Sequence, residues 1–169
     1  YTYIPDMKNV KFRDDIDYVH FTYNNTIFGS RFTELPQTNA TLVTDMSSNI
    51  LSEVVDVSKF GLIYAGAQKN IAPAGLTIVI VKKDLATRVK DSVPTPLRYT
   101  TQIEANSLAN TPPTFGIYMF DLVLDWIKEQ GGLNAINAVN EQKAAALYDL
   151  IDSSDFYRAF AKPGSATKS

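Results

Sequence analysis

Short runs of β-branched and aromatic residues are followed along the chain by longer segments of helical periodicity. Four runs predict strands, at residues 18–22, 41–44, 61–65 and 76–81. The third and fourth are continuous apolar runs, which are typical of strands covered on both faces of a sheet. Ser58 and Lys59 lead the chain into the third strand, and residues 84–91 predict a short helix.

Two amphipathic helices are predicted in the second half of the chain. In the first helix, apolar residues recur at spacings of three and one along the sequence, which places them on a single face. They are Phe115, Tyr118, Met119, Leu122, Val123, Trp126 and Ile127. We expect this aromatic stripe to pack into the core rather than to form a ligand platform. Residues 111–114 carry a capping signal for its start, and Gly131 and Gly132 stop it. The second helix carries Ile136, Val139, Leu147, Leu150 and Ile151. This order of elements predicts an α/β layered domain.

Lys69 lies among small residues between the third and fourth predicted strands. We expect such a loop to hold little water. Loss of water favours the neutral amine of a lysine, a nucleophile suited to Schiff-base chemistry. On spacing alone, an ordinary solvated lysine is the better interpretation, because most lysines are exposed.

Three polar residues follow three of the predicted strands. Thr26 follows the first, Asp45 the second and Lys69 the third. In an open parallel sheet the carboxyl ends of the strands form one edge, where ligands bind. A single Asp after a strand is usually a turn or cap residue, but the coincidence of three favours a site. His20 is interpreted as a strand residue with a satisfied hydrogen bond.

Composition narrows the classes of function. A length of 169 residues predicts a single domain. The formal net charge of −2 does not favour binding to nucleic acid or to an anionic membrane. It has no cysteine and one histidine, so no metal site is expected. No apolar run is long enough to span a bilayer, and no signal peptide is visible. Both ends look cut, and we expect a piece of a longer protein.

Several segments carry a resemblance to a known family. They are residues 24–29, 45–52, 55–61, 65–71, 110–115 and 154–158. The most diagnostic is the string Gly-Ala-Gln-Lys-Asn at residues 66–70. With these segments the chain resembles the phosphoserine aminotransferases, pyridoxal-phosphate enzymes of the aspartate-aminotransferase fold. It departs from the usual family pattern at Asn25, where Glu is common, and at Ala72, where Gly is common. Both positions flank the functional residues and leave them intact.

The resemblance implies the fold class and the domain organisation. The fold would be the α/β large domain of a pyridoxal-phosphate-dependent transferase, with a mostly parallel sheet and flanking helices in three layers. Residues 1–152 would form part of this cofactor-binding domain. Residues 153–169 would begin the connection to a small C-terminal domain.

The resemblance also implies roles at the cofactor ring. Lys69 would form the Schiff base with the aldehyde of pyridoxal 5'-phosphate and then carry the proton between substrate and cofactor. Asp45 would face the pyridine nitrogen and keep it protonated. Thr26 would donate a hydrogen bond to the ring.

Three further residues would bind the cofactor phosphate. Gln68 would hold the phosphate in the same subunit. Asn110 and Thr111 would reach the phosphate of the neighbouring subunit's cofactor, so that a homodimer shares its active sites. A helix cap is the alternative for Thr111, and both roles can hold together, because a helix start suits an anion.

The implied reaction transfers the amino group of glutamate to 3-phosphohydroxypyruvate, giving O-phosphoserine and 2-oxoglutarate. This is a cytoplasmic step of serine biosynthesis, with a further role in pyridoxine biosynthesis in some bacteria. The isolated chain is expected to be inactive, and the substrate-binding arginines to lie outside it. One alternative is a fold-related enzyme, such as an alanine–glyoxylate aminotransferase or a cysteine desulfurase. Desulfurases usually carry His where this chain has Gln68. The other alternative is a non-catalytic scaffold, which would need none of Asp45, Gln68 and Lys69.

Overall fold

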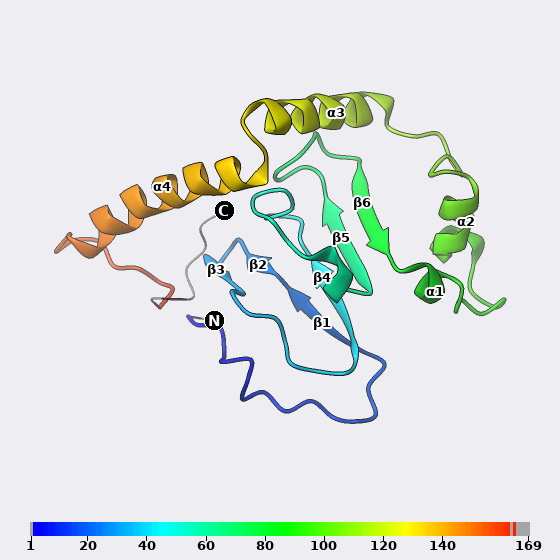
Figure 1. Cartoon of the computed structure of the whole chain (residues 1–169), viewed down its shortest axis with the longest axis horizontal. Helices are drawn as coiled ribbons and strands as arrows, with labels where there is room; N and C mark the ends of the chain where they lie inside the picture. The colour runs from blue at the N-terminus through cyan, green and yellow to red at the C-terminus, as the bar shows by residue number, and fades with distance from the viewer. Residues whose placement is uncertain (1, 163, 165–169) are drawn as a thin grey trace.

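The computed structural model describes residues 2–162 and 164, which form a sheet with helices beside it (Figure 1). The strands are β1 (Tyr18–Thr22), β2 (Asn24–Asn25), β3 (Ser30–Arg31), β4 (Thr41–Asp45), β5 (Leu62–Gly66) and β6 (Thr77–Val81). The helices are α1 (Lys83–Ala86), α2 (Tyr99–Glu104), α3 (Thr114–Glu129) and α4 (Leu133–Asp152), with 3₁₀ turns η1 (Val57–Lys59) and η2 (Thr95–Leu97). The four predicted strands and both long helices are confirmed, while β2, β3, η1, η2 and α2 were not predicted.

The main sheet has the strand order β1-β4-β5-β6. β1, β4 and β5 run parallel, so their carboxyl ends meet at one edge, as predicted. β6 runs antiparallel to β5, because the connection between them is a short loop that reverses the chain. The fold is therefore of the α/β class, with a mostly parallel sheet and one antiparallel edge strand.

In the part of the chain that the structure describes, only one face of this sheet is fully buried. Along β1, β4 and β5, buried positions alternate with half-buried or exposed ones, since successive side chains of a strand point to opposite faces. The prediction that the third and fourth strands are covered on both faces is wrong. Within the described residues, β6 has a neighbouring strand on one side only, and its Val79 and Ile80 are exposed. A run of apolar letters does not distinguish such an edge strand from a central one.

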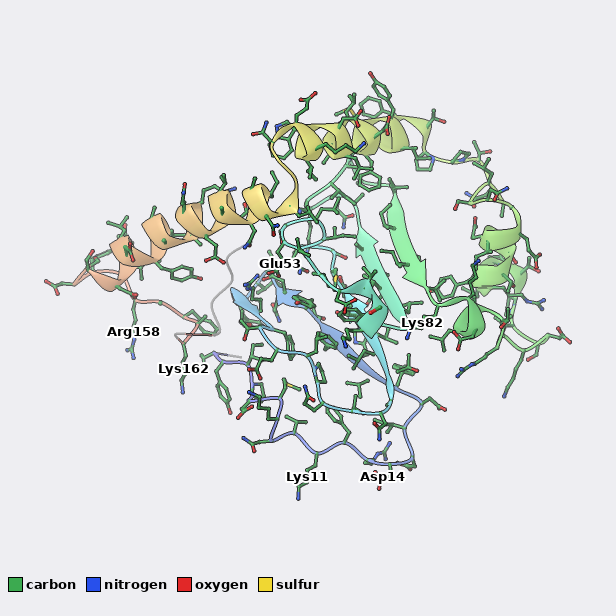
Figure 2. The ribbon with its side chains drawn as sticks, in the orientation of Figure 1. Lys11, Asp14, Glu53, Lys82, Arg158 and Lys162 are labelled. Atoms are coloured by element: carbon green, nitrogen blue, oxygen red, sulfur yellow. The ribbon has the colours of Figure 1, made fainter. Side chains whose placement is uncertain are left out.

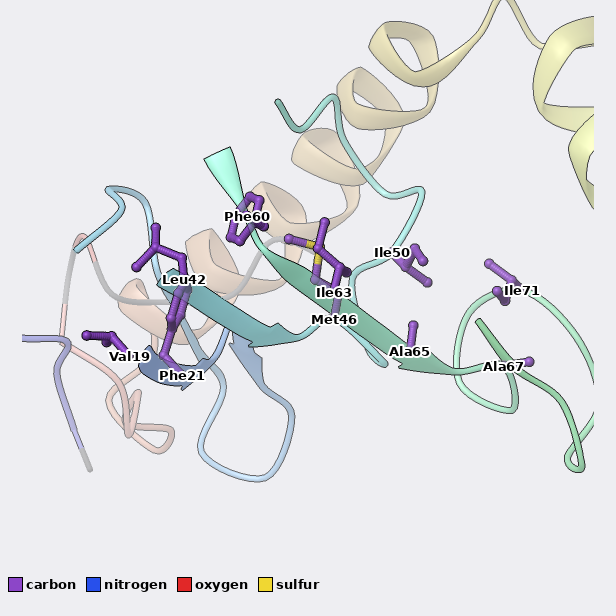
Figure 3. Close-up of a cluster of buried hydrophobic side chains, with 10 residues drawn as sticks. All are labelled: Val19, Phe21, Leu42, Met46, Ile50, Phe60, Ile63, Ala65, Ala67 and Ile71. Atoms are coloured by element: carbon purple, nitrogen blue, oxygen red, sulfur yellow. The ribbon is translucent and has the colours of Figure 1, made fainter. Parts of the chain in front are cut away.

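The core lies on the buried face and extends into the loops before and after the strands (Figure 3). Its strand residues are Val19, Phe21, Leu42, Ile63 and Ala65, and its loop residues are Met46, Ile50, Phe60, Ala67 and Ile71. Ala67 and Ile71 come from the loop that follows β5, where the Ile71 N–H donates to the Ala67 carbonyl at 3.1 Å. The core therefore anchors that loop on both sides of Lys69.

Helix α3 ends where the sequence predicts. Gly131 and Gly132 have φ angles of +95° and +84°, and the Gly132 N–H donates to the Ile127 carbonyl at 2.9 Å. This left-handed conformation favours glycine and closes the helix. The predicted side-chain cap is absent at the start, where Pro113 takes the N-cap position. Thr111 lies outside the helix and does not cap it.

The aromatic stripe of α3 does not pack into the core of the described residues, contrary to the prediction. Phe115, Tyr118 and Trp126 are 67%, 58% and 50% exposed, and only Gly116 and Ile127 of this helix are buried. Figure 1 shows why, because α3 lies beyond the ends of β5 and β6 rather than over a face of the sheet. Periodicity predicts an apolar helix face but not what covers it.

Two further predictions concern short or terminal segments. The helix predicted at 84–91 is α1, which ends at Ala86, where the Thr87 hydroxyl donates to the Asp84 carbonyl and competes with the helix hydrogen bonds. The predicted domain boundary coincides with the end of α4 at Asp152. Residues 163 and 165–169 lie outside the described part of the chain, and the division into two domains stays a prediction. Within the described residues, no helix has the length and apolar character needed to cross a membrane.

Candidate active site

Thr26 and Lys69 meet at the carboxyl edge of the parallel strands. Thr26 lies in the turn between β2 and β3, and Lys69 lies in the loop between β5 and β6. The Lys69 Nζ donates a hydrogen bond to the Thr26 Oγ1 at 3.0 Å. The tertiary structure thus brings together two residues that are 43 positions apart in the chain.

The surroundings of Lys69 differ from the sequence prediction. Gln68, Lys69 and Asn70 are all exposed, although Ala67 and Ile71 on either side are buried. The expectation of a loop with little water is therefore wrong for the described chain. The reason is that β6 is an exposed edge strand, so the loop is packed against the core from one side only.

Asp45 is the last residue of β4 and lies at the same edge. Its Oδ1 accepts a hydrogen bond from the Ser47 N–H at 2.8 Å, which makes it a turn residue as well as a site candidate. The Ser47 Oγ in turn accepts a hydrogen bond from the Gly66 N–H at 2.9 Å. The loop after β4 therefore fixes the carboxylate and joins it to the end of β5.

The loop at residues 46–53, which we name the β4 loop, connects the segments that carry the candidates. Asn24 lies on β2, just before Thr26. Its Nδ2 donates a hydrogen bond to the Ser48 Oγ of the β4 loop at 2.8 Å. The Ser48 hydroxyl donates to the Asn24 carbonyl at 2.9 Å. Asn70, directly after Lys69, donates through Nδ2 to the Ile50 carbonyl at 2.5 Å. Asn24 and Asn70 thus position the site, a role that was not predicted from the sequence.

Gln68 lies over the end of β5. A methyl group placed on Gly66 would come within 2.7 Å of the Gln68 Oε1 and 3.0 Å of its Nε2. The Gln68 amide thus occupies the space that a side chain at Gly66 would take. The Gln68 amide is exposed and presents hydrogen-bond donors beside the strand that neighbours Asp45.

Asn110 and Thr111 lie apart from the other candidates. Both are exposed in the segment between α2 and α3. Asn110 accepts a hydrogen bond from the Gln102 Nε2 and donates to the Thr111 carbonyl, each at 3.2 Å. Among the described residues, no hydrogen bond joins either of them to Asp45 or Lys69.

His20 and Tyr64 lie beside Asp45 on the open face of the sheet. The His20 Nε2 and the Tyr64 Oη are 2.9 Å apart, which confirms the satisfied hydrogen bond predicted for His20. Burial raises the pKa of Tyr64, and the nearby charge of Asp45 raises it further. Tyr64 was not predicted as a site residue. Strand alternation predicts which residues share a face with Tyr64 within β5, but only the register of β4 and β5 places Tyr64 beside Asp45.

An amine, a carboxylate, a hydroxyl and an amide are therefore gathered at the carboxyl edge of three parallel strands. No group of acidic residues and histidine in the described residues could hold a metal ion. Fold and site together define an α/β domain with a lysine-centred site. The chain belongs to the class-V aminotransferase family, which matches residues 4–169.

Within this family, the chain is similar to phosphoserine aminotransferases. It is 55% identical to that of Geobacillus kaustophilus over 166 residues, which cover 98% of this chain and 46% of the relative. It is 50% identical to that of Bacillus subtilis over 169 residues, or 99% of this chain and 47% of the relative. The chain thus spans about half the length of the curated relatives it matches.

Solved structures show the same likeness. The phosphoserine aminotransferase from Bacillus circulans subsp. alkalophilus superposes with a TM-score of 0.95 at 45% identity, over 99% of this chain and 47% of that one. The phosphoserine aminotransferase from Trichomonas vaginalis, described as PLP bound, gives a TM-score of 0.93 at 38% identity, with the same coverage. The fold class predicted from the sequence is confirmed.

Proposed function

We propose that this chain is part of a pyridoxal-phosphate-dependent phosphoserine aminotransferase. The reaction would convert 3-phosphohydroxypyruvate and glutamate to O-phosphoserine and 2-oxoglutarate. The observation that carries the proposal is the contact between the Lys69 Nζ and the Thr26 Oγ1 at the edge where Asp45 ends β4. The identity to phosphoserine aminotransferases over nearly the whole chain supports this choice among the reactions of the family.

The residues at this edge fit the cofactor. When bound, pyridoxal phosphate supplies an aldehyde carbon and an electron-accepting ring. The Lys69 amine would be the covalent attachment point and would afterwards act as the base that moves a proton. The Asp45 carboxylate, held by the Ser47 N–H, would pair with a protonated ring nitrogen. Thr26 offers a hydroxyl that already bonds Lys69 and can turn to a ring oxygen.

The phosphate end of the cofactor needs donors from elsewhere. We assign Gln68 to the phosphate, because its exposed amide lies over the end of β5. We assign Asn110 and Thr111 to the phosphate held by a second subunit. Within one chain the Asn110 side chain bonds Gln102 and the Thr111 carbonyl rather than Asp45 or Lys69, which supports this assignment. The proposal therefore includes a homodimer with shared sites, located in the cytoplasm.

The domain organisation belongs to the same proposal. Residues 1–152 would form part of the cofactor-binding domain, and residues 153–169 would begin the connection to a smaller one. A chain that spans about half of its relatives would lack further cofactor and substrate contacts. We therefore expect the 169-residue chain alone to bind the cofactor weakly and to show no transamination.

The test uses the full-length protein that contains these residues. It is loaded with pyridoxal phosphate, reduced with borohydride and digested, and the peptide that carries the cofactor is identified by mass. We expect the cofactor on Lys69. Lys69→Ala should abolish the adduct and lower the rate with glutamate and 3-phosphohydroxypyruvate at least a thousandfold, or about 4 kcal/mol of transition-state stabilisation. The matched control Lys59→Ala removes another exposed lysine and should leave both unchanged. An adduct on a different lysine would contradict the proposal.

A further inference from the structure

Ser47 contacts both the Asp45 carboxylate and the chain that leads to Lys69. Its backbone N–H donates to the Asp45 Oδ1 at 2.8 Å. Its Oγ accepts a hydrogen bond at 2.9 Å from the N–H of Gly66, the last residue of β5. One half-buried residue of the β4 loop thus joins the candidate carboxylate to the segment that carries the candidate amine.

The way in which β4 ends explains why a hydroxyl is needed at this position. The Met46 N–H donates to the Tyr64 carbonyl at 2.9 Å, which continues the parallel ladder by one hydrogen bond beyond β4. The Met46 carbonyl would be the next acceptor in that ladder. It instead accepts from two N–H groups of the β4 loop, at 2.8 and 3.1 Å, because the chain turns there. The Ser47 Oγ takes its place as the acceptor for the Gly66 N–H.

A second hydrogen bond holds the same segment beyond Lys69. Residues 67–76, between β5 and β6, form what we name the lysine loop. The Asn70 Nδ2 of this loop donates to the Ile50 carbonyl of the β4 loop at 2.5 Å. Lys69 itself is exposed, and the β4 loop holds the chain on both sides of it, at Gly66 and at Asn70.

We propose that Ser47 is a positioning residue, which sets the spacing between the Lys69 amine and the Asp45 carboxylate for the cofactor. This inference rests on the proposed function. In pyridoxal phosphate, the carbon that bears the aldehyde and the ring nitrogen lie at opposite ends of one rigid ring. A ligand that attaches to Lys69 and pairs with Asp45 therefore requires a fixed spacing of the two side chains. Ser47 holds the carboxylate through its N–H and the start of the lysine loop through its Oγ, so it acts on both ends of that spacing.

The first experiment measures the dissociation constants of two ligands for variants of the full-length apoprotein. Pyridoxal phosphate contacts both residues, whereas 4-deoxypyridoxine phosphate has a methyl group in place of the aldehyde and cannot attach to Lys69. Ser47→Ala removes the hydroxyl but keeps the N–H that holds Asp45. We expect it to weaken the binding of pyridoxal phosphate about tenfold, the upper range for the loss of one hydrogen bond, and that of the analogue less than about twofold.

Two further variants test the same spacing. Ser47→Thr retains the hydroxyl and should bind both ligands nearly as tightly as the wild type. Asn70→Ala releases the lysine loop on the other side of Lys69, and because Asn70 is exposed the variant should fold. It should show the same selective loss of affinity for pyridoxal phosphate.

Ser52→Ala is the matched control. It removes a hydroxyl of the same loop, which donates to the Asn49 carbonyl at 2.7 Å, and it should leave both dissociation constants unchanged. If Ser47→Ala weakens the two ligands equally, or weakens neither, the positioning role is refuted. A wild-type protein that does not attach pyridoxal phosphate at Lys69 would refute the proposed function instead.

The second experiment needs no cofactor. The rate of hydrogen exchange of the Gly66 amide in the apoprotein reports its bond to the Ser47 Oγ. We expect exchange about tenfold faster in Ser47→Ala than in the wild type, Ser47→Thr and Ser52→Ala. An unchanged rate in Ser47→Ala would overturn the inference whether or not the cofactor attaches at Lys69. The failure of the inference and the failure of the proposed function are therefore distinguishable.

Discussion

Replacing Glu53 by Gln removes one charge from an ion pair that ties the β4 loop to the hairpin carrying Thr26. The Arg31 Nη1 lies 2.8 Å from the Glu53 Oε1, and the two side chains are only 11% and 18% exposed. The Arg31 Nε is buried without a hydrogen-bond partner among the described residues. Figure 2 shows Glu53 beside the β2–β3 hairpin. The pair is thus mostly buried, and the Arg31 guanidinium depends on Glu53 to compensate its charge.

The burial sets the size of the effect. Breaking a fully buried pair costs about 3–5 kcal/mol, because the remaining charge has no partner. Exposed pairs contribute about 0–1 kcal/mol. With both side chains mostly but not wholly buried, we expect Glu53→Gln to lower the free energy of unfolding by about 2–3 kcal/mol. Replacing both residues by Leu should cost less than the single change, since it leaves no buried charge.

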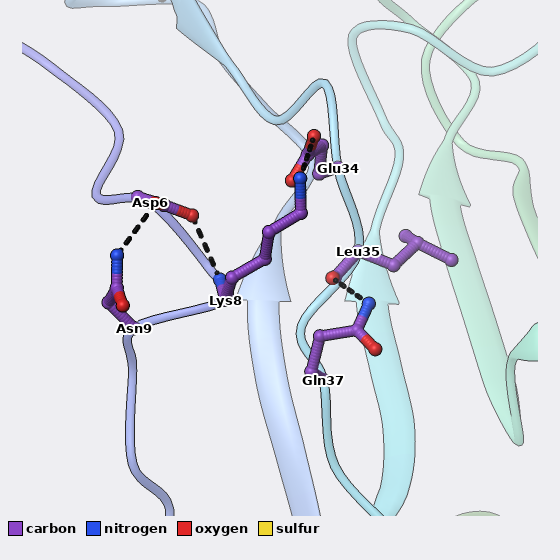
Figure 4. A network of polar contacts seen from close by, with 6 residues as sticks. All are labelled: Asp6, Lys8, Asn9, Glu34, Leu35 and Gln37. Atoms are coloured by element: carbon purple, nitrogen blue, oxygen red, sulfur yellow. Dashed lines mark hydrogen bonds and ion pairs between the residues drawn. The ribbon is translucent and has the colours of Figure 1, made fainter.

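The assay is urea unfolding of the full-length protein, comparing midpoints under matched conditions. The control is Glu34→Gln, which breaks the Lys8–Glu34 pair (Figure 4). Its side chains are 67% and 52% exposed, so no measurable change is expected. A midpoint for Glu53→Gln equal to that of Glu34→Gln would refute the reasoning, as would a Leu/Leu variant less stable than the single one.

Two other predictions follow from the packing. A Cβ at Gly61 would overlap the Thr41 methyl and lie 2.5 Å from Leu85 Cδ1, so Gly61→Ala should destabilise the protein by about 1–3 kcal/mol. At Gly116 the atom nearest to an added Cβ is 3.7 Å away, so Gly116→Ala should stabilise α3 by about 0.5–1 kcal/mol. In thermal denaturation, the melting temperature should fall for Gly61→Ala and rise for Gly116→Ala, and shifts of the same sign would contradict the reasoning. Burial raises the pKa of Tyr23 above the usual value of about 10. The stability that the neutral phenol contributes is therefore lost as the pH rises from about 10 through the folded pKa, and Tyr23→Phe should flatten this loss. If the urea midpoint fell equally steeply with pH in the wild type and in Tyr23→Phe, the prediction for Tyr23 would be contradicted.

Much of the site follows from the sequence because its residues occupy regular positions. Thr26, Asp45 and Lys69 each follow a predicted strand, and parallel pairing brings strand ends to one edge. The structure adds the contact of Lys69 with Thr26. It also shows that Asp45 acts as a turn residue, through its hydrogen bond with Ser47, while it lies at the carboxyl edge of the strands.

The residues that support the site were harder to find. Asn24 and Asn70 position the site through hydrogen bonds to the β4 loop. The Tyr64 hydroxyl meets His20 across an intervening strand. Such contacts depend on which strands are neighbours and on their register, and neither is encoded in local periodicity. The exposure of Lys69 was missed for the same reason, since it depends on β6 lying at an edge.

The order of apolar and polar positions by itself determined where the four long strands and the two long helices form, because side-chain periodicity is a local property of the backbone. The tertiary structure alone decided that β6 is antiparallel and exposed, and that the aromatic face of α3 stays uncovered among the described residues. It also decided that His20, Asp45 and Tyr64 meet on one face. Pairing direction, coverage and side-chain meetings arise from contacts between segments far apart in the chain, which a local pattern does not specify.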